Sequence, residues 1–176
     1  PTSAVKAYVP NANEVTQLEA DPRSHQTLYA RSLSKILTSK DGGSNWSIFL
    51  ENFDGEPLQA MALEARAPYR MAIGTNNGVY MATNPGQGFK PYTLAGDHIT
   101  ALSFVKNDDR LVVAIGQQQS EIVRIQLSNK GQQKLGLLDD ILVHHISYDP
   151  REENGLHLAT QSGLYGTWNN LHSLFQ

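Results

Sequence analysis

The chain has 176 residues, of which 40% are hydrophobic and 18% charged, with no cysteine and a formal net charge of -3. This length is sufficient for one domain with a buried core. The absence of cysteine excludes disulfides, thiolate metal sites and a cysteine nucleophile, and the slight acidic excess argues against a general nucleic-acid binder. No apolar run approaches the roughly 20 residues that a membrane-spanning helix needs.

Taken in chain order, the predicted elements are short strands separated by polar turns. A candidate strand at residues 3–9 precedes four units, each of which opens on an apolar strand. These opening strands are expected at residues 15–20, 58–65, 99–105 and 141–148. The second strands are expected at residues 28–30, 71–73, 111–115 and 156–159. Regular short strands without a sustained helical period indicate an all-β fold.

The third strand of each unit and the turn after it form an internal repeat. The segments 35–46, 78–89 and 163–174 align without a gap, and a weaker copy begins at Glu121. One apolar column recurs every 42 or 43 residues, at Ile36, Val79, Ile122 and Leu164. This period, with four antiparallel strands per unit, predicts a single β-propeller domain of four blades. The predicted blades are approximately 15–57, 58–98, 99–140 and 141–176. A β-sandwich also has regular turns, but it does not produce a gap-free repeat.

The two ends of the chain allow two alternatives for how the propeller ring is closed. Residues 3–9 correspond to an outer fourth strand, and the chain ends where the outer strand of the fourth blade is expected. In one arrangement residues 3–9 complete the last blade and close a four-bladed ring. In the other, the chain is part of a larger propeller that a further segment or a second copy completes, because an open array exposes sheet edges.

The turn at residues 39–46, Ser-Lys-Asp-Gly-Gly-Ser-Asn-Trp, resembles the Asp-box, or BNR repeat, with the pattern Ser/Thr-x-Asp-x-Gly-x-Thr/Ser-Trp. It departs from that pattern only at Asn45. The resemblance implies a structural turn between the third and fourth strands of a blade, in which the aspartate accepts backbone N–H groups. The residues that would have this structural role are Ser39, Asp41, Gly43, Trp46, Asn84, Gly86 and Phe89.

Asp-box propellers include sialidases, sortilin-type receptors, xyloglucan-active glycosidases and the photosystem II assembly-factor group. The repeat pattern of this sequence most resembles that of the assembly-factor-like and sortilin-type propellers. A sialidase-type site needs three convergent arginines, whereas most arginines here fall at the corners between first and second strands. We therefore expect a protein that is not an enzyme and that has no cofactor.

No metal site is expected either. His144 and His145 are the only adjacent histidines, and neighbouring residues of a strand point to opposite faces.

Charge is distributed unevenly between the two ends of the predicted blades. The end with the connections between blades and the second-to-third-strand turns carries eight carboxylates against Arg31 and Lys35. These carboxylates are Glu14, Glu51, Asp54, Glu56, Asp97, Glu121, Asp139 and Asp140. The other end carries nine cationic residues against six carboxylates. Opposed charge of this kind can steer a charged partner.

These observations favour a non-catalytic propeller that acts as a protein-interaction or assembly module through its loops. The hypothetical partner-binding residues are Asp54, Glu56, Asp97, Asp139 and Asp140. The expected partner is a basic protein segment, a larger complex or a second copy of the chain. Nucleic acid is not expected as a partner, and the chain is not expected to span a membrane. A carbohydrate-binding or glycosidase-like propeller is the alternative. A start at Pro1 suits a cleaved export signal, so an extracytoplasmic location is expected.

Overall fold

The computed structural model describes residues 15–106, 108–148 and 155–167. The predicted strand at residues 3–9 lies outside this range, as does the end of the fourth predicted blade. The chain divides into two compact units, with the boundary between Leu58 and Gln59.

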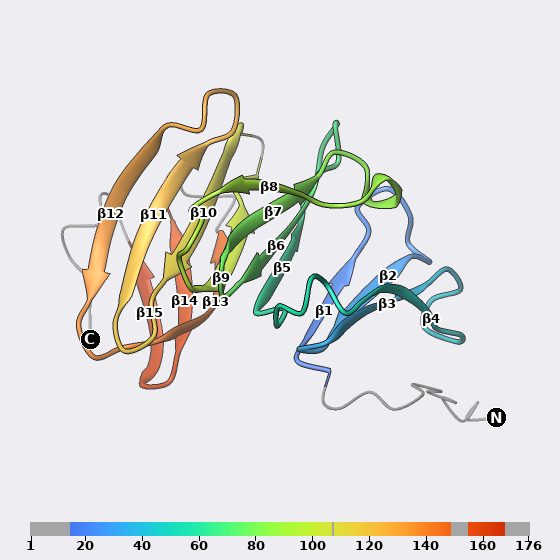
Figure 1. Ribbon diagram of the computed structural model, residues 1–176, viewed down its shortest axis with the longest axis horizontal. Helices are drawn as coiled ribbons and strands as arrows, with labels where there is room; N and C mark the ends of the chain where they lie inside the picture. Colours follow the sequence, from blue (N-terminus) through green and yellow to red (C-terminus); the bar gives the residue numbers. More distant parts are fainter. Residues whose placement is uncertain (1–14, 107, 149–154, 168–176) are drawn as a thin grey trace. The chain divides into compact units, whose positions relative to one another are not determined.

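The first unit contains one four-stranded antiparallel sheet in the order β1-β2-β3-β4 (Figure 1). Its strands are β1 (Gln17–Ala20), β2 (Leu28–Arg31), β3 (Lys35–Ser39) and β4 (Ser47–Glu51). Ile36 and Leu37 are buried in the middle of the sheet, and the rings of Tyr29 and Phe49 meet edge to face at 5.2 Å. Each strand follows its neighbour in sequence, so the sheet is a simple meander.

The second unit contains three further meanders. The second sheet has four strands: β5 (Ala60–Leu63), β6 (Met71–Thr75), β7 (Gly78–Ala82) and β8 (Lys90–Thr93). The third also has four: β9 (Ile99–Phe104), β10 (Arg110–Ile115), β11 (Ser120–Gln126) and β12 (Gln132–Leu138). The fourth has three described strands: β13 (Val143–Tyr148), β14 (Leu156–Thr160) and β15 (Gly163–Thr167). A short 3-10 turn, η1 (Pro85–Gln87), precedes β8.

The third sheet is buried on both faces, which explains its continuous apolar strands. Along β10, Leu111 and Val113 belong to the core shared with the second sheet, whereas Val112 and Ala114 belong to the core shared with the fourth. Alternate residues of a strand point to opposite faces, so one apolar run fills both cores. At Gly74 of β6 an added Cβ would lie 2.5 Å from Ile99 Cγ2, so the second and third sheets are in close contact there.

Successive antiparallel meanders of this kind are the blades of a β-propeller. The predicted all-β propeller class is therefore confirmed. The fourth strand predicted for the last blade lies outside the described residues, and the other three strands of that sheet fall within them.

The histidine pair lies at an irregularity in its strand. A register shift in β13 between Val143 and His145 leaves both His144 and His145 exposed. The shift interrupts the two-residue period of the strand at this point, and the expectation that the two side chains point to opposite faces stays a prediction.

Candidate functional site: two ends of the sheets with different electrostatics

Connections between successive sheets leave at the same end as the second-to-third-strand turns. We call residues 52–58, 94–98 and 139–142 the inter-sheet connections. In the first unit the N–H of Asn52 donates to the carbonyl of Ser34 at 3.1 Å. In the second unit the N–H of Gly96 donates to Asn77 Oδ1 at 3.0 Å, and the N–H of Gln161 donates to the carbonyl of Leu142 at 3.2 Å. Each connection is thus attached to a neighbouring turn.

Backbone geometry makes these connections tight. Asp54, Leu94 and Asp140 all adopt positive φ angles, of 47°, 56° and 56°. Gly78 begins β7 beneath the second connection, and a Cβ there would lie 2.6 Å from the carbonyl oxygen of Leu94. The left-handed residues and the close approach at Gly78 hold the connections in compact turns.

Carboxylates on the inter-sheet connections have no partners within the described part of the chain. No side-chain hydrogen bond or ion pair is formed by the following five residues: Asp54, Glu56, Asp97, Asp139 and Asp140. Two of the other carboxylates predicted for this end are paired, Glu51 with Lys35 at 3.1 Å and Glu121 with Lys134 at 3.3 Å. Glu14 lies outside the described residues.

The two cations predicted for this end do not balance the free carboxylates. Lys35 is held by Glu51. Arg31 is buried, and its guanidinium donates to the carbonyl of Leu58 and, at 3.2 Å, to Gln17 Oε1. Burial lowers the pKa of Arg31 to about 10. Both positive charges are therefore engaged within the first unit.

The opposite end of each sheet carries the corners between the first and second strands. We call residues 21–27, 64–70 and 105–109 (apart from 107) the strand corners. In the first, Asp21 receives a two-pronged contact from Arg23, with Nη2 at 2.6 Å from Oδ2. This hydrogen bonding lowers the pKa of Asp21, although burial opposes it.

The second corner is organised around Arg70. Its guanidinium lies 2.6 Å from Glu64 Oε1 and 3.1 Å from Asp109 Oδ1, so one cation joins two corners within the second unit. Glu64 is only 8% exposed. Burial alone would raise the pKa of Asp109, but hydrogen bonds from Arg70, Ser128 and Gln126 together lower it. In the third corner Asp108 pairs with Arg110.

The turn after β3 has an internal hydrogen-bond network. Asp41 Oδ1 accepts from the N–H of Asn45 and from the hydroxyl of Ser39, each at 2.8 Å. These bonds, led by the backbone N–H of Asn45, lower the pKa of Asp41 to about 2. Trp46 Nε1 donates to the carbonyl of Gly43 at 3.0 Å. The corresponding turn of the second sheet has one related bond, from the N–H of Gly86 to Asn84 Oδ1 at 3.4 Å.

These bonds give the turn after β3 a structural role in the first sheet, whereas its membership of the Asp-box repeat stays a prediction. Phe89, at the position that corresponds to Trp46, is half-buried.

Among the described residues, no group of three or more histidine or acidic side chains is placed to hold a metal ion. Nor does that part of the chain contain a helix long and apolar enough to cross a membrane. The candidate site residues are therefore the unpaired carboxylates on the inter-sheet connections of each unit. The sequence did not predict the ion pairs at the strand corners, because only the three-dimensional structure distinguishes paired carboxylates from free ones.

Several solved structures share this fold. An auxiliary nutrient binding protein from Bacteroides thetaiotaomicron matches with a TM-score of 0.74 and 13% identity, over 92% of this chain and 40% of that one. YCF48 bound to D1 peptide matches with a TM-score of 0.60 and 16% identity, over 96% and 55%. The Niastella koreensis GH74 enzyme matches with a TM-score of 0.66 and 16% identity, over 89% and 30%.

These matches confirm a β-propeller fold, shared by binding proteins and by glycosidases. In all three cases this chain spans less than two thirds of the matched protein. No protein-family model matches the sequence, and no curated protein is detectably similar to it.

Proposed function

We propose that this chain is a non-catalytic propeller module that binds a basic segment of a protein partner through its inter-sheet connections. The observation that carries the proposal is the set of five carboxylates without partners on the inter-sheet connections. Unpaired charge on a rigid loop attracts an oppositely charged partner without first losing an internal ion pair. Loops held by a stable scaffold are common positions for binding residues.

Two features of known propellers support a role in protein interaction. YCF48 was solved with a bound peptide, and another structural match comes from a nidogen–laminin complex. The extracytoplasmic location is part of the same proposal, since one neighbour is the extracellular domain of a one-component system.

The test uses a ten-residue peptide of alternating lysine and glycine, titrated into the full chain at low ionic strength. A variant that replaces all five carboxylates with their amides is expected to bind the peptide at least about tenfold more weakly. A peptide of alternating glutamate and glycine is the charge control and should not bind to these connections. Equal binding of the lysine peptide by the variant and the original chain would reject the proposal.

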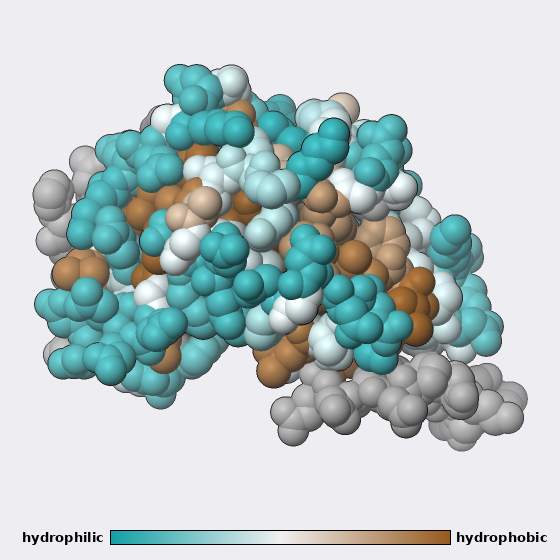
Figure 2. All heavy atoms as spheres, in the orientation of Figure 1, coloured by the Kyte–Doolittle hydropathy of each residue, from teal (hydrophilic) through white to brown (hydrophobic). Residues whose placement is uncertain are grey.

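A carbohydrate-binding role is the second candidate, and one feature favours it. A shallow hollow of about 370 Å³ in the third sheet is lined mainly by amide and guanidinium groups, from Arg110, Arg124, Gln126, Asn129, Gln132 and Gln133. Gln132 and Gln133 belong to β12, and Figure 2 shows mainly hydrophilic surface at the hairpin loop between β11 and β12. Such groups can hydrogen-bond sugar hydroxyls. A glycan array distinguishes the two roles, because the Gln126→Ala and Gln133→Ala variants should lose any glycan signal and keep peptide binding.

A further inference from the structure

One apolar row of side chains recurs from sheet to sheet. In the third sheet the pairing registers place Leu102 opposite Val113 and Val113 opposite Val123, and all three belong to the core shared with the second sheet. In the fourth sheet the corresponding pair is Ile146 and Leu158, which belong to the core shared with the third sheet. In both cases this row faces the preceding sheet.

The first sheet has the same row, and part of it is uncovered. Leu18 in β1 pairs with Ala30 in β2, Ala30 with Leu37 in β3, and Leu37 with Ile48 in β4. Directly opposite residues of neighbouring strands point to the same face of a sheet, so we call these four residues the leading row. Ala30 and Leu37 are buried, but Leu18 is 59% and Ile48 55% exposed.

The first strand of each sheet shows the difference most clearly. Leu102 of β9 and Ile146 of β13 are only 3% and 2% exposed. Leu18 has the corresponding position in β1 and is more than half exposed. A leucine at this position is therefore buried where a preceding sheet packs against it, and the first sheet shows the same position open.

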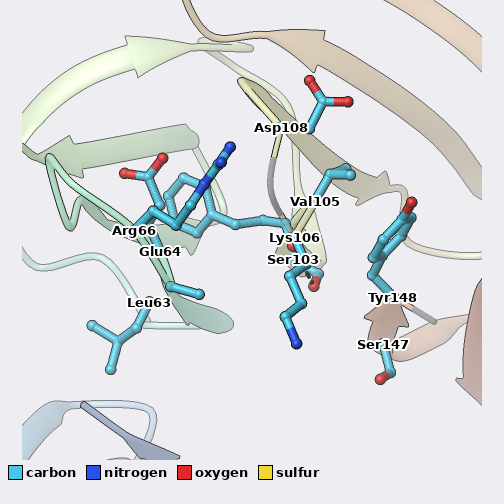
Figure 3. A pocket seen from close by; sticks show the side chains of 11 residues that line it. Leu63, Glu64, Arg66, Ser103, Val105, Lys106, Asp108, Ser147 and Tyr148 are labelled. Atoms are coloured by element: carbon cyan, nitrogen blue, oxygen red, sulfur yellow. Dashed lines mark hydrogen bonds between the residues drawn. The ribbon is translucent and has the colours of Figure 1, made fainter. Parts of the chain in front are cut away.

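Successive sheets of the second unit meet through their first strands, since β9 contacts both β5 and β13. Figure 3 shows Leu63, Ser103 and Ser147, one from each of these strands, around a cavity of about 200 Å³ at the strand-corner end. Repeated structural units stack through contacts between nearest neighbours. A sheet that precedes the first one in the same manner would place its own first strand beside β1, over Leu18.

The fourth sheet exposes the complementary kind of face. In the third sheet Ala114 pairs with Ile122, and both belong to the core shared with the fourth sheet that follows. The corresponding residues of the fourth sheet are Ala159 and Leu164, which we call the trailing pair. Leu164 is 84% exposed. This chain therefore carries, on two different sheets, both halves of the interface that sheets of the second unit form with each other.

We propose that the leading row binds the trailing pair of a second copy of this chain. Such a contact continues the sheet-to-sheet interfaces of the second unit, and it removes exposed leucine side chains from water. Because the two faces are different, two copies can form the contact twice and leave neither face open. Each copy contributes four sheets, and the pair is then at the upper end of the roughly four to eight blades of known propellers. The inter-sheet connections take no part in this contact.

Sedimentation equilibrium of the full chain tests the association, and a dimer is expected at about 100 μM. Leu18→Lys and Leu164→Lys should each weaken dimer formation at least about tenfold, because each puts a charge into both contacts of the pair. Leu33→Lys is the matched control, since Leu33 is 54% exposed but lies in the turn between β2 and β3. It should leave the dimer unchanged, and circular dichroism checks that all three variants keep the fold. A monomeric original chain at that concentration would overturn the proposal, as would equal losses in all three variants.

A mixture of the Leu18→Lys and Leu164→Lys variants tests whether the two faces bind each other. In a mixed pair one contact joins the intact leading row of one copy to the intact trailing pair of the other. The mixture is therefore expected to associate at a concentration at which each variant alone is monomeric. No association in the mixture would contradict the proposed pairing of faces. A dimer that is weakened by Leu18→Lys but not by Leu164→Lys would show that the leading row binds itself, which would also overturn the proposal.

Discussion

The inter-sheet connections and the strand corners carry similar residue types and use them in opposite ways. At the corners each carboxylate is bound by an arginine, Asp21 by Arg23 and Glu64 by Arg70. On the connections the carboxylates of Asp97 and Asp140 have no such partner among the described residues. Buried, paired charge contributes to the structure, whereas free charge on a tight loop is available to a ligand. Four variants test this contrast, from the largest expected effect to the smallest.

Removal of the Glu64 carboxylate should have the largest effect. Glu64→Ala leaves Arg70, whose side chain is only 15% exposed, without its main partner. Loss of one member of a buried pair costs about 3 kcal/mol, so the free energy of unfolding should fall by about that amount. Urea unfolding followed by circular dichroism measures it. A change below about 0.5 kcal/mol would mean that the corner pair does not stabilise the fold.

A change in the backbone at the connections should reduce the stability of the fold more than a loss of charge there. Gly78→Ala places a Cβ 2.6 Å from the carbonyl oxygen of Leu94, at a φ of 110°. We expect a loss of about 2 kcal/mol. Gly96→Ala is the matched control, because its φ of 88° is also positive but no atom lies within 4 Å of the added Cβ. Its cost should be about 1 kcal/mol, and equal melting temperatures for the two variants would contradict the close packing beneath this connection.

Acid should weaken the corner of the first unit through Asp21. Hydrogen bonding to Arg23 holds the pKa of Asp21 below its ordinary value of 3.8. A depressed pKa stabilises the fold above that ordinary value, and the contribution is lost as the pH falls through the folded-state pKa. Asp21→Asn should therefore cost about 1 kcal/mol at neutral pH, and the difference should shrink below about pH 4. A difference that is constant down to pH 2 would exclude this linkage.

Neutralisation of the connections should have the smallest effect on stability. The Asp139→Asn/Asp140→Asn variant removes two carboxylates without partners in the described residues. Its free energy of unfolding should change by less than about 0.5 kcal/mol. A loss of 2 kcal/mol or more would show that these side chains have a structural role.

Much of the fold could be predicted from the sequence because the repeat has both a fixed period and a strand pattern. Ile36, Val79 and Ile122 are all nearly fully buried in third strands, as the aligned apolar column indicates, whereas its fourth member, Leu164, is 84% exposed. The register shift beside His144 and His145 could not be predicted, since a bulge has no clear signature in residue type.

The candidate site could be predicted from the sequence less completely than the fold. The excess of carboxylates at one end is visible in the residue order, but pairing is not. Glu64 and Arg70 are six residues apart, and Arg70 and Asp109 are 39 apart and come from different sheets. The cavity at the strand-corner end of the second unit is built from β5, β9 and β13, so it depends on how three sheets pack.

The most direct test of the central claim compares free and paired carboxylates in one binding measurement. Two double variants each remove two negative charges: Asp139→Asn/Asp140→Asn from the connections, and Glu51→Gln/Glu121→Gln from ion pairs with Lys35 and Lys134. Each is titrated calorimetrically with the lysine–glycine peptide at the same low ionic strength. We predict that the first variant binds several-fold more weakly than the original chain and that the second binds with unchanged affinity. Equal losses in both variants, or a loss in the second alone, would contradict the distinction between free and paired charge.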